Sequence, residues 1–90
     1  MNTRDIEFLL AYIDVYGMQK RPLFEVCSEI TSFFTEAMEA TEGEFSKAGY
    51  IDSFIMQYND MKKHGIEDKV KFYTMVLGYS LSDACVELGI

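Results

Sequence analysis

Apolar side chains recur at steps of three and four residues along nearly the whole 90-residue sequence. This spacing is typical of helices that bury one face, because about 3.6 residues complete a helical turn. No segment alternates apolar and polar residues between turn pairs such as Asn-Gly, so strands have little support. We therefore expect an all-α fold, a compact single-domain bundle over residues 1–90. Its five helices are predicted near residues 4–16, 22–42, 50–64, 67–77 and 81–88.

Residues suited to helix termini separate these segments. Asn2 or Thr3, Pro22 and Ser80 can begin helices, because polar side chains accept hydrogen bonds from free N–H groups and proline has no N–H to satisfy. Glycine favours the left-handed conformation that often follows a helix. We expect the helices to end at the glycines that follow them, which are Gly17, Gly43, Gly65, Gly78 and Gly89.

The first two helices differ in how much apolar surface they carry. The first is apolar on most of its circumference, with one stripe through Leu10 and a second through Phe8. Such a helix either lies at the centre of the fold or uses part of its surface to contact another molecule. The second helix is amphipathic, and we expect its Leu23, Ile30 and Phe34 face to be buried.

The charge of the chain constrains its partners. Fifteen acidic and eight basic residues give a net charge of −7. Proteins that neutralise phosphates usually have the opposite sign, so direct nucleic-acid binding is not expected, whereas attraction to basic surfaces is. The longest uncharged apolar run, residues 8–13, is much shorter than the ~20 residues that span a bilayer. Acid also stands near the N-terminus, where a signal peptide needs basic residues, so we expect a cytoplasmic protein without a membrane partner.

Acidic side chains line one face of the second predicted helix. They follow one another at intervals of 4, 7 and 3 residues, which places them within roughly an 80° sector. The four side chains, which we call the acidic ridge, are Glu25, Glu29, Glu36 and Glu39. Residues 22–46 also contain Glu42 and Glu44 and no basic residue, so we expect the ridge to lack neutralising partners. The ridge is either a solvated face or a surface kept for a basic partner.

Aromatic and methionine side chains are numerous for a chain of this length, with seven Phe, six Tyr and six Met. Short helices cannot enclose all of them, so we expect several to form an exposed patch that contacts a partner or a second copy of the chain. Phe24 lies at the margin of the second helix, between its apolar face and the acidic ridge. Met56 and Phe72 lie off the main apolar stripes of their helices, which makes them candidates for this patch.

The sequence lacks the residues that most catalytic and metal sites need. His64 is the one histidine, and the helix dipole explains a positive charge in the last turn of a helix. Cys27 and Cys85 are too few for a zinc site, and the sequence leaves open whether they are free thiols or bonded to each other. Phosphate-binding glycine loops and calcium loops are missing. We expect no catalytic, cofactor-binding or metal-binding residue, and therefore no enzyme.

Residues 80–90 resemble the segment that precedes the recognition helix in helix-turn-helix DNA-binding domains. That family places a small residue four positions before the turn glycine, and Cys85 and Gly89 match this spacing. Because the sequence ends where the recognition helix would begin, we expect the groove-reading residues to be missing. The resemblance implies either a DNA-binding or transcription-associated protein or a simple two-helix packing unit.

We interpret the sequence as a non-enzymatic binding protein that regulates or inhibits a protein partner with a basic surface. A partner that handles nucleic acid is the most economical choice, because carboxylates can imitate phosphates in its basic groove. By size and charge the chain is similar to small acidic inhibitors that phages encode. The alternatives are DNA binding and a self-associating structural or assembly protein. The predicted partner-binding residues are Glu25, Glu29, Glu36, Glu39, Glu42, Glu44 and Phe24.

Overall fold

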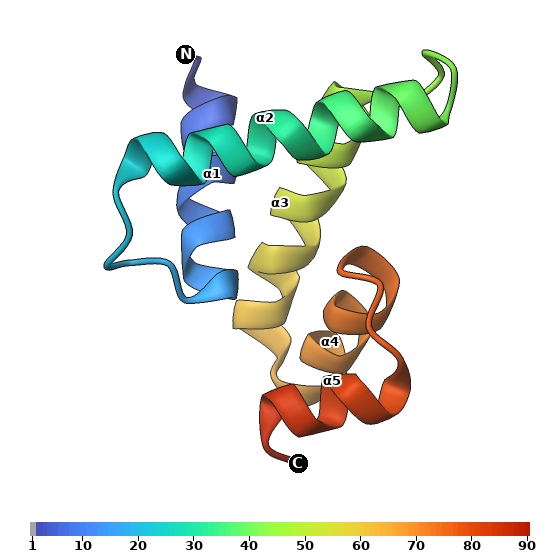
Figure 1. Ribbon diagram of the computed structural model, residues 1–90. Coiled ribbons are helices and arrows are strands. Elements are labelled where there is room, and N and C mark those ends of the chain that lie inside the picture. Colours follow the sequence, from blue (N-terminus) through green and yellow to red (C-terminus); the bar gives the residue numbers. More distant parts are fainter. Residues whose placement is uncertain (1) are drawn as a thin grey trace. The chain divides into compact units, whose positions relative to one another are not determined.

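A computed structural model describes residues 2–90 of the chain (Figure 1). Its elements are α1 (Thr3–Tyr16), α2 (Leu23–Ala40), α3 (Lys47–His64), α4 (Ile66–Lys71), the π-helical segment η1 (Phe72–Val76) and α5 (Leu81–Leu88). Residues 2–90 contain no β-strand. The predicted all-α fold with about five helices is confirmed.

Polar side chains begin α1 and α5 as the sequence predicts. Asn2 Oδ1 accepts a hydrogen bond from the Asp5 N–H (2.8 Å), and Ser80 Oγ accepts one from the Asp83 N–H (3.1 Å). Both bonds satisfy N–H groups that a helix leaves free in its first turn. Pro22 directly precedes α2 and has no N–H that would need a partner there.

The chain divides into two compact units, Met1–Ile51 and Asp52–Ile90, with the boundary inside α3. The first unit contains α1, α2 and the first residues of α3. The second unit contains the rest of α3 together with α4, η1 and α5. Each unit has buried side chains of its own.

Aromatic side chains form the core of the first unit. Phe8 of α1 is buried, and its ring centroid lies 5.9 Å from that of Phe34 in α2 and 6.1 Å from that of Tyr50 in α3. Phe45, in the loop before α3, lies 5.9 Å from Phe34. Ring pairs at such distances contribute about 0.5–1.5 kcal/mol beyond the burial of their area. These contacts join α1 to α2, which runs across it in Figure 1. Phe8 is buried and Phe34, Phe45 and Tyr50 are half-buried, whereas Tyr16, Phe24 and Phe33 remain exposed.

Two phenylalanines in edge-to-face contact lie in the core of the second unit. Phe54 of α3 and Phe72 of η1 are fully buried, with ring centroids 5.1 Å apart in an edge-to-face arrangement. The expected exposure of Phe72 is therefore wrong. A regular α-helix would leave Phe72 off the apolar stripe, but the Leu77 N–H donates to the Phe72 carbonyl, five residues back (3.2 Å). This wider turn shifts the register of the residues after Phe72, so the apolar stripe of a regular helix does not continue across it.

Two leucines that the apolar stripes place in the core are exposed. Leu10 is 61% exposed and Leu23 is 59% exposed. In α1 the buried residues are instead Phe8 and Ala11, so the stripe through Phe8 faces inward. The inward stripe carries the larger aromatic ring, whose burial stabilises the fold more. Leu23 is the first residue of α2, where no preceding helical turn covers it.

Candidate partner-binding surface

The predicted partner-binding residues lie on α2 and on the loop that follows it. They are Phe24, Glu25, Glu29, Glu36, Glu39, Glu42 and Glu44. All are exposed except Glu29, which is half-buried. Phe24 is 71% exposed, in agreement with its position at the margin of the apolar face. The side chains are therefore accessible, and their role in binding stays a prediction.

Arg21 pairs with both glutamates in the N-terminal half of the acidic ridge and offsets one of their two charges. Its Nη1 lies 2.6 Å from Glu29 Oε1, and its Nη2 lies 3.6 Å from Glu25 Oε2. The hydrogen bond to Glu29 is the main reason that the pKa of Arg21 is raised above its usual value. The expectation of a ridge without neutralising partners is wrong for these two glutamates. Arg21 lies just outside residues 22–46 and one helical turn before Glu25, where a side chain can reach it.

The C-terminal half of the ridge has no such partner. Within residues 2–90, its carboxylates and those of the next loop form no ion pair with a Lys, Arg or His side chain. The last turn of α2 also lacks a basic residue, although the free carbonyl groups at a helix C-terminus attract positive charge. We call this group of side chains the acidic end. It consists of Glu36, Glu39, Glu42 and Glu44.

The turn that ends α2 places a glutamate where glycine is usually found. The Gly43 N–H donates to the Met38 carbonyl (2.8 Å). The Glu42 N–H donates to the Glu39 carbonyl (3.2 Å), and the two bonds together form a Schellman motif. Among residues 2–90, Glu42 is the one non-glycine residue with a positive φ, at 54°. For such a residue the left-handed conformation brings Cβ close to a carbonyl oxygen and costs about 1–2 kcal/mol.

Two other helices end in the same motif with glycine at the corresponding position. Gly17 follows α1 and Gly89 follows α5, and each donates to the carbonyl three residues before it. The residue after each glycine donates to the carbonyl five residues before it, as Gly43 does. Gly17 and Gly89 have φ values of 65° and 73°, similar to that of Glu42. Among these three turns, Glu42 is less favourable than glycine in two ways. Its side chain strains the left-handed backbone, and its negative charge lies at the negative end of the helix dipole.

Apolar surface adjoins the acidic end. A surface groove of about 390 Å³ has Thr35, Met38 and Glu39 of α2 along one wall, with Lys47 of α3 also lining it. Met38 is 40% exposed, and Phe24 lies on the same side of α2, nearer its N-terminus. The groove has room for an apolar side chain of a partner beside the unpaired carboxylates.

Other candidate chemistry is not assembled in the part of the chain that the structure describes. Residues 2–90 contain no group of three or more His, Cys, Asp or Glu side chains that could hold a metal ion. Cys27 and Cys85 are free thiols. His64 lies in the last turn of α3 with two lysines, as predicted. None of the helices formed by residues 2–90 combines the length and the apolar character that crossing a bilayer requires.

Comparison of the chain with protein-family models, with curated proteins and with solved structures gives no match. The candidate site is therefore defined by the geometry and charge of this chain. It combines the unpaired carboxylates of the acidic end, the left-handed turn at Glu42 and the groove beside Met38.

Proposed function

We propose that the protein is a non-enzymatic regulator or inhibitor that binds a basic protein surface through the acidic end. The observation that carries this proposal is the left-handed Glu42, at a position where glycine would cost less. Its carboxylate also follows the negative end of the α2 dipole, where a basic residue would be stabilising. A residue that opposes folding in two ways is expected where function requires it.

The other side chains of the acidic end support the same role. Within residues 2–90, Glu36, Glu39 and Glu44 form no ion pair, so contact with a partner would break no internal one. Opposite charges on two proteins accelerate their association and disfavour partners of the wrong charge. The groove beside Met38 adds an apolar anchor point, which contributes affinity that exposed charges alone do not.

Proteins that handle nucleic acid are the partner class that we propose. Their binding grooves hold Lys and Arg side chains that neutralise phosphates, and carboxylates carry the same sign of charge. The protein and nucleic acid would then compete for one groove. The free thiols Cys27 and Cys85 suit a cytoplasmic protein, and we place its action there.

A capture experiment with matched charge variants tests the proposal. Immobilised protein is incubated with a nuclease-treated lysate of the source cells at low and at high salt. We expect the wild type to retain a basic protein at low salt, and duplex DNA to displace it. A variant with all four glutamates of the acidic end changed to glutamine should lose this capture. A control variant with Glu25→Gln and Glu29→Gln should keep it, because Arg21 already pairs with these side chains.

Two results would contradict parts of the proposal. If both variants capture the partner as the wild type does, the acidic end is not the binding surface. If capture depends on the acidic end but DNA does not displace the captured protein, the partner does not use this surface to bind nucleic acid. Circular dichroism of each variant shows whether its helices are intact.

Self-association is a second candidate function, favoured by exposed apolar side chains on α5. Leu81 is exposed, and Val86 is 77% exposed. A second copy of the chain that covers these side chains would remove their apolar surface from water. Light scattering at increasing concentration tests this alternative, which a monomer at high concentration would contradict.

DNA binding through residues 80–90 stays a prediction. The α5 helix carries Asp83 and Glu87 and no Lys or Arg, so its own charge does not favour contact with phosphates. A mobility shift with duplex DNA that weakens steeply with salt would support it. No shift at low salt would exclude it.

A further inference from the structure

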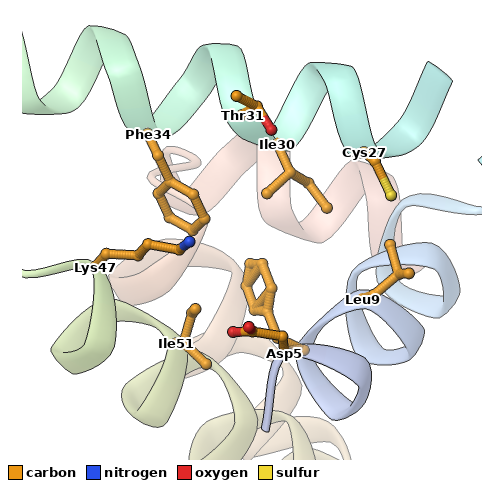
Figure 2. A pocket seen from close by; sticks show the side chains of 9 residues that line it. Asp5, Leu9, Cys27, Ile30, Thr31, Phe34, Lys47 and Ile51 are labelled. Carbon is orange, nitrogen blue, oxygen red and sulfur yellow. The ribbon is translucent and has the colours of Figure 1, made fainter. Parts of the chain in front are cut away.

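A small pocket in the first unit lies beside the aromatic core (Figure 2). Its volume is about 120 Å³, and its apolar walls come from Phe8, Leu9, Ile30, Phe34 and Ile51. An apolar cavity of about 150 Å³ admits benzene, so this one has room for a group of about four or five carbon atoms. Sites for nucleotides and drug-sized ligands usually start at about 300 Å³. The volume therefore restricts the ligand to a molecule smaller than a nucleotide or a typical drug.

Two side chains of opposite charge also line this pocket. Asp5 lies in the first turn of α1, and Lys47 is the first residue of α3. Figure 2 shows Lys47 extended toward the ring of Phe34 and the carboxylate of Asp5 on the side of Ile51. The Lys47 Nζ lies 5.4 Å from the centroid of the Phe34 ring.

Neither of these two charged groups is satisfied by an ion pair or a hydrogen bond within residues 2–90. The helix dipole stabilises Asp5, and the Phe34 ring stabilises Lys47, but neither effect uses the hydrogen-bonding capacity of the groups. An ammonium has three donors and a carboxylate has two acceptor oxygens. A cation and an anion therefore remain available beside an apolar pocket.

We propose that this pocket binds a small zwitterion with an aliphatic side chain, of the class of the free aliphatic amino acids. The ligand amine pairs with Asp5, and the ligand carboxylate pairs with Lys47. The aliphatic group occupies the space between Ile30 of α2 and Ile51 of α3. A ligand with one charge would pair with only one of Asp5 and Lys47 and leave the other without a partner.

Titration with L-leucine, followed by the NMR signals of backbone amides, tests the proposal. We expect saturable shifts at Cys27, Ile30 and Ile51, with a dissociation constant on the order of 1 mM for a ligand this small. Two analogues each lack one charge, 4-methylpentanoate without the amine and 3-methylbutylamine without the carboxylate. Each should bind about tenfold more weakly, because a charge-assisted hydrogen bond is lost.

Substitutions of the two charged pocket residues should reduce affinity as the removal of a ligand charge does. Asp5→Asn and Lys47→Gln should each weaken L-leucine binding about tenfold. Thr31 is exposed and lines the pocket, so Thr31→Trp should block it without disturbing the core. The matched control is Asp83→Asn, because Asp83 follows the Ser80 cap as Asp5 follows Asn2 and has no place in this pocket. This control should bind L-leucine as the wild type does.

Three results would overturn the proposal. The first is the absence of saturable shifts with L-leucine, L-isoleucine or L-valine up to about 10 mM. The second is binding of either singly charged analogue as tightly as L-leucine. The third is unchanged affinity in Asp5→Asn and Lys47→Gln while both variants remain helical. None of these results bears on the acidic end, because the probe is a small molecule and the variants leave those glutamates in place.

Discussion

Replacing Glu42 by glycine should make the protein more stable. The change relieves left-handed strain of about 1–2 kcal/mol, from which the greater freedom of glycine in the unfolded chain subtracts about 0.5–1 kcal/mol. Removing a carboxylate from the negative end of α2 adds about 0.3–1 kcal/mol. The free energy of unfolding should therefore rise by about 0.3–2.5 kcal/mol. For a chain of this size, each kcal/mol raises Tm by about 4–8 °C.

Urea and thermal unfolding followed by circular dichroism measure this change, and two further variants separate its causes. Glu42→Gln removes the charge and keeps the backbone strain, so it should gain the electrostatic part alone. Gly17→Glu makes the opposite change in the matching turn after α1, and it should lower the free energy of unfolding by a similar amount. No atom lies within 4 Å of a Cβ added at Gly17, so a steric clash would not explain that loss.

A Tm of Glu42→Gly at or below that of the wild type would refute this reasoning. In that case the left-handed conformation of Glu42 carries no strain, and the observation that supports the proposed function is lost. The proposal also requires the two properties to change in opposite directions. Glu42→Gly should unfold at a higher temperature and bind its basic partner more weakly than the wild type.

Four further substitutions test the core and the surface charges. Burial raises the pKa of Tyr50 above 10.0, so the native state keeps this proton more tightly than the unfolded state and stability falls as the pH rises past that value. Tyr50→Phe should reduce this alkaline loss, measured by urea unfolding across the pH range. Phe72→Ala should lower the free energy of unfolding by about 3–5 kcal/mol, and Phe24→Ala by much less, because the first ring is fully buried and the second is exposed; denaturant titration measures both. Arg21→Gln breaks the contact with Glu29 and should lower Tm more at low salt than at high salt in thermal unfolding.

The positions of the helices could be predicted well because they depend on local spacing and caps. The bounds of α5 agree with the prediction, and α1 begins one residue earlier than expected. The buried stripe of α1 could not be predicted, because Leu10 and Phe8 both fit a helical repeat. Contacts with other elements decide between them, and Phe8 packs against Phe34 and Tyr50. The π-helical turn that begins at the buried Phe72 likewise has no signal in the apolar spacing.

Of the candidate site, the sequence identifies the carboxylates but not their partners. A charge count over residues 22–46 omits Arg21, whose side chain reaches forward along α2 to Glu25 and Glu29. The spacing of one turn between Arg21 and Glu25 is the signal that could have found the contact. The unused charges of Asp5 and Lys47 lie 42 positions apart in the sequence and share a pocket only once α1 and α3 are in place.

The exception at the end of α2 lies at the same place as the proposed binding surface. The preference for glycine after a helix predicts a positive φ at Gly43, which the structure has (87°), but the residue before it, Glu42, also has a positive φ and occupies the turn position that glycine occupies after α1 and α5. At the ends of α1 and α5 the same preference predicts the turns correctly, because glycine adopts the left-handed conformation there without the strain that a Cβ brings. Backbone conformation and helix dipole both disfavour a glutamate in this turn. A turn that places a glutamate where two matching turns place glycine is where local sequence rules and the structure disagree, and such sites are expected to be functional or strained.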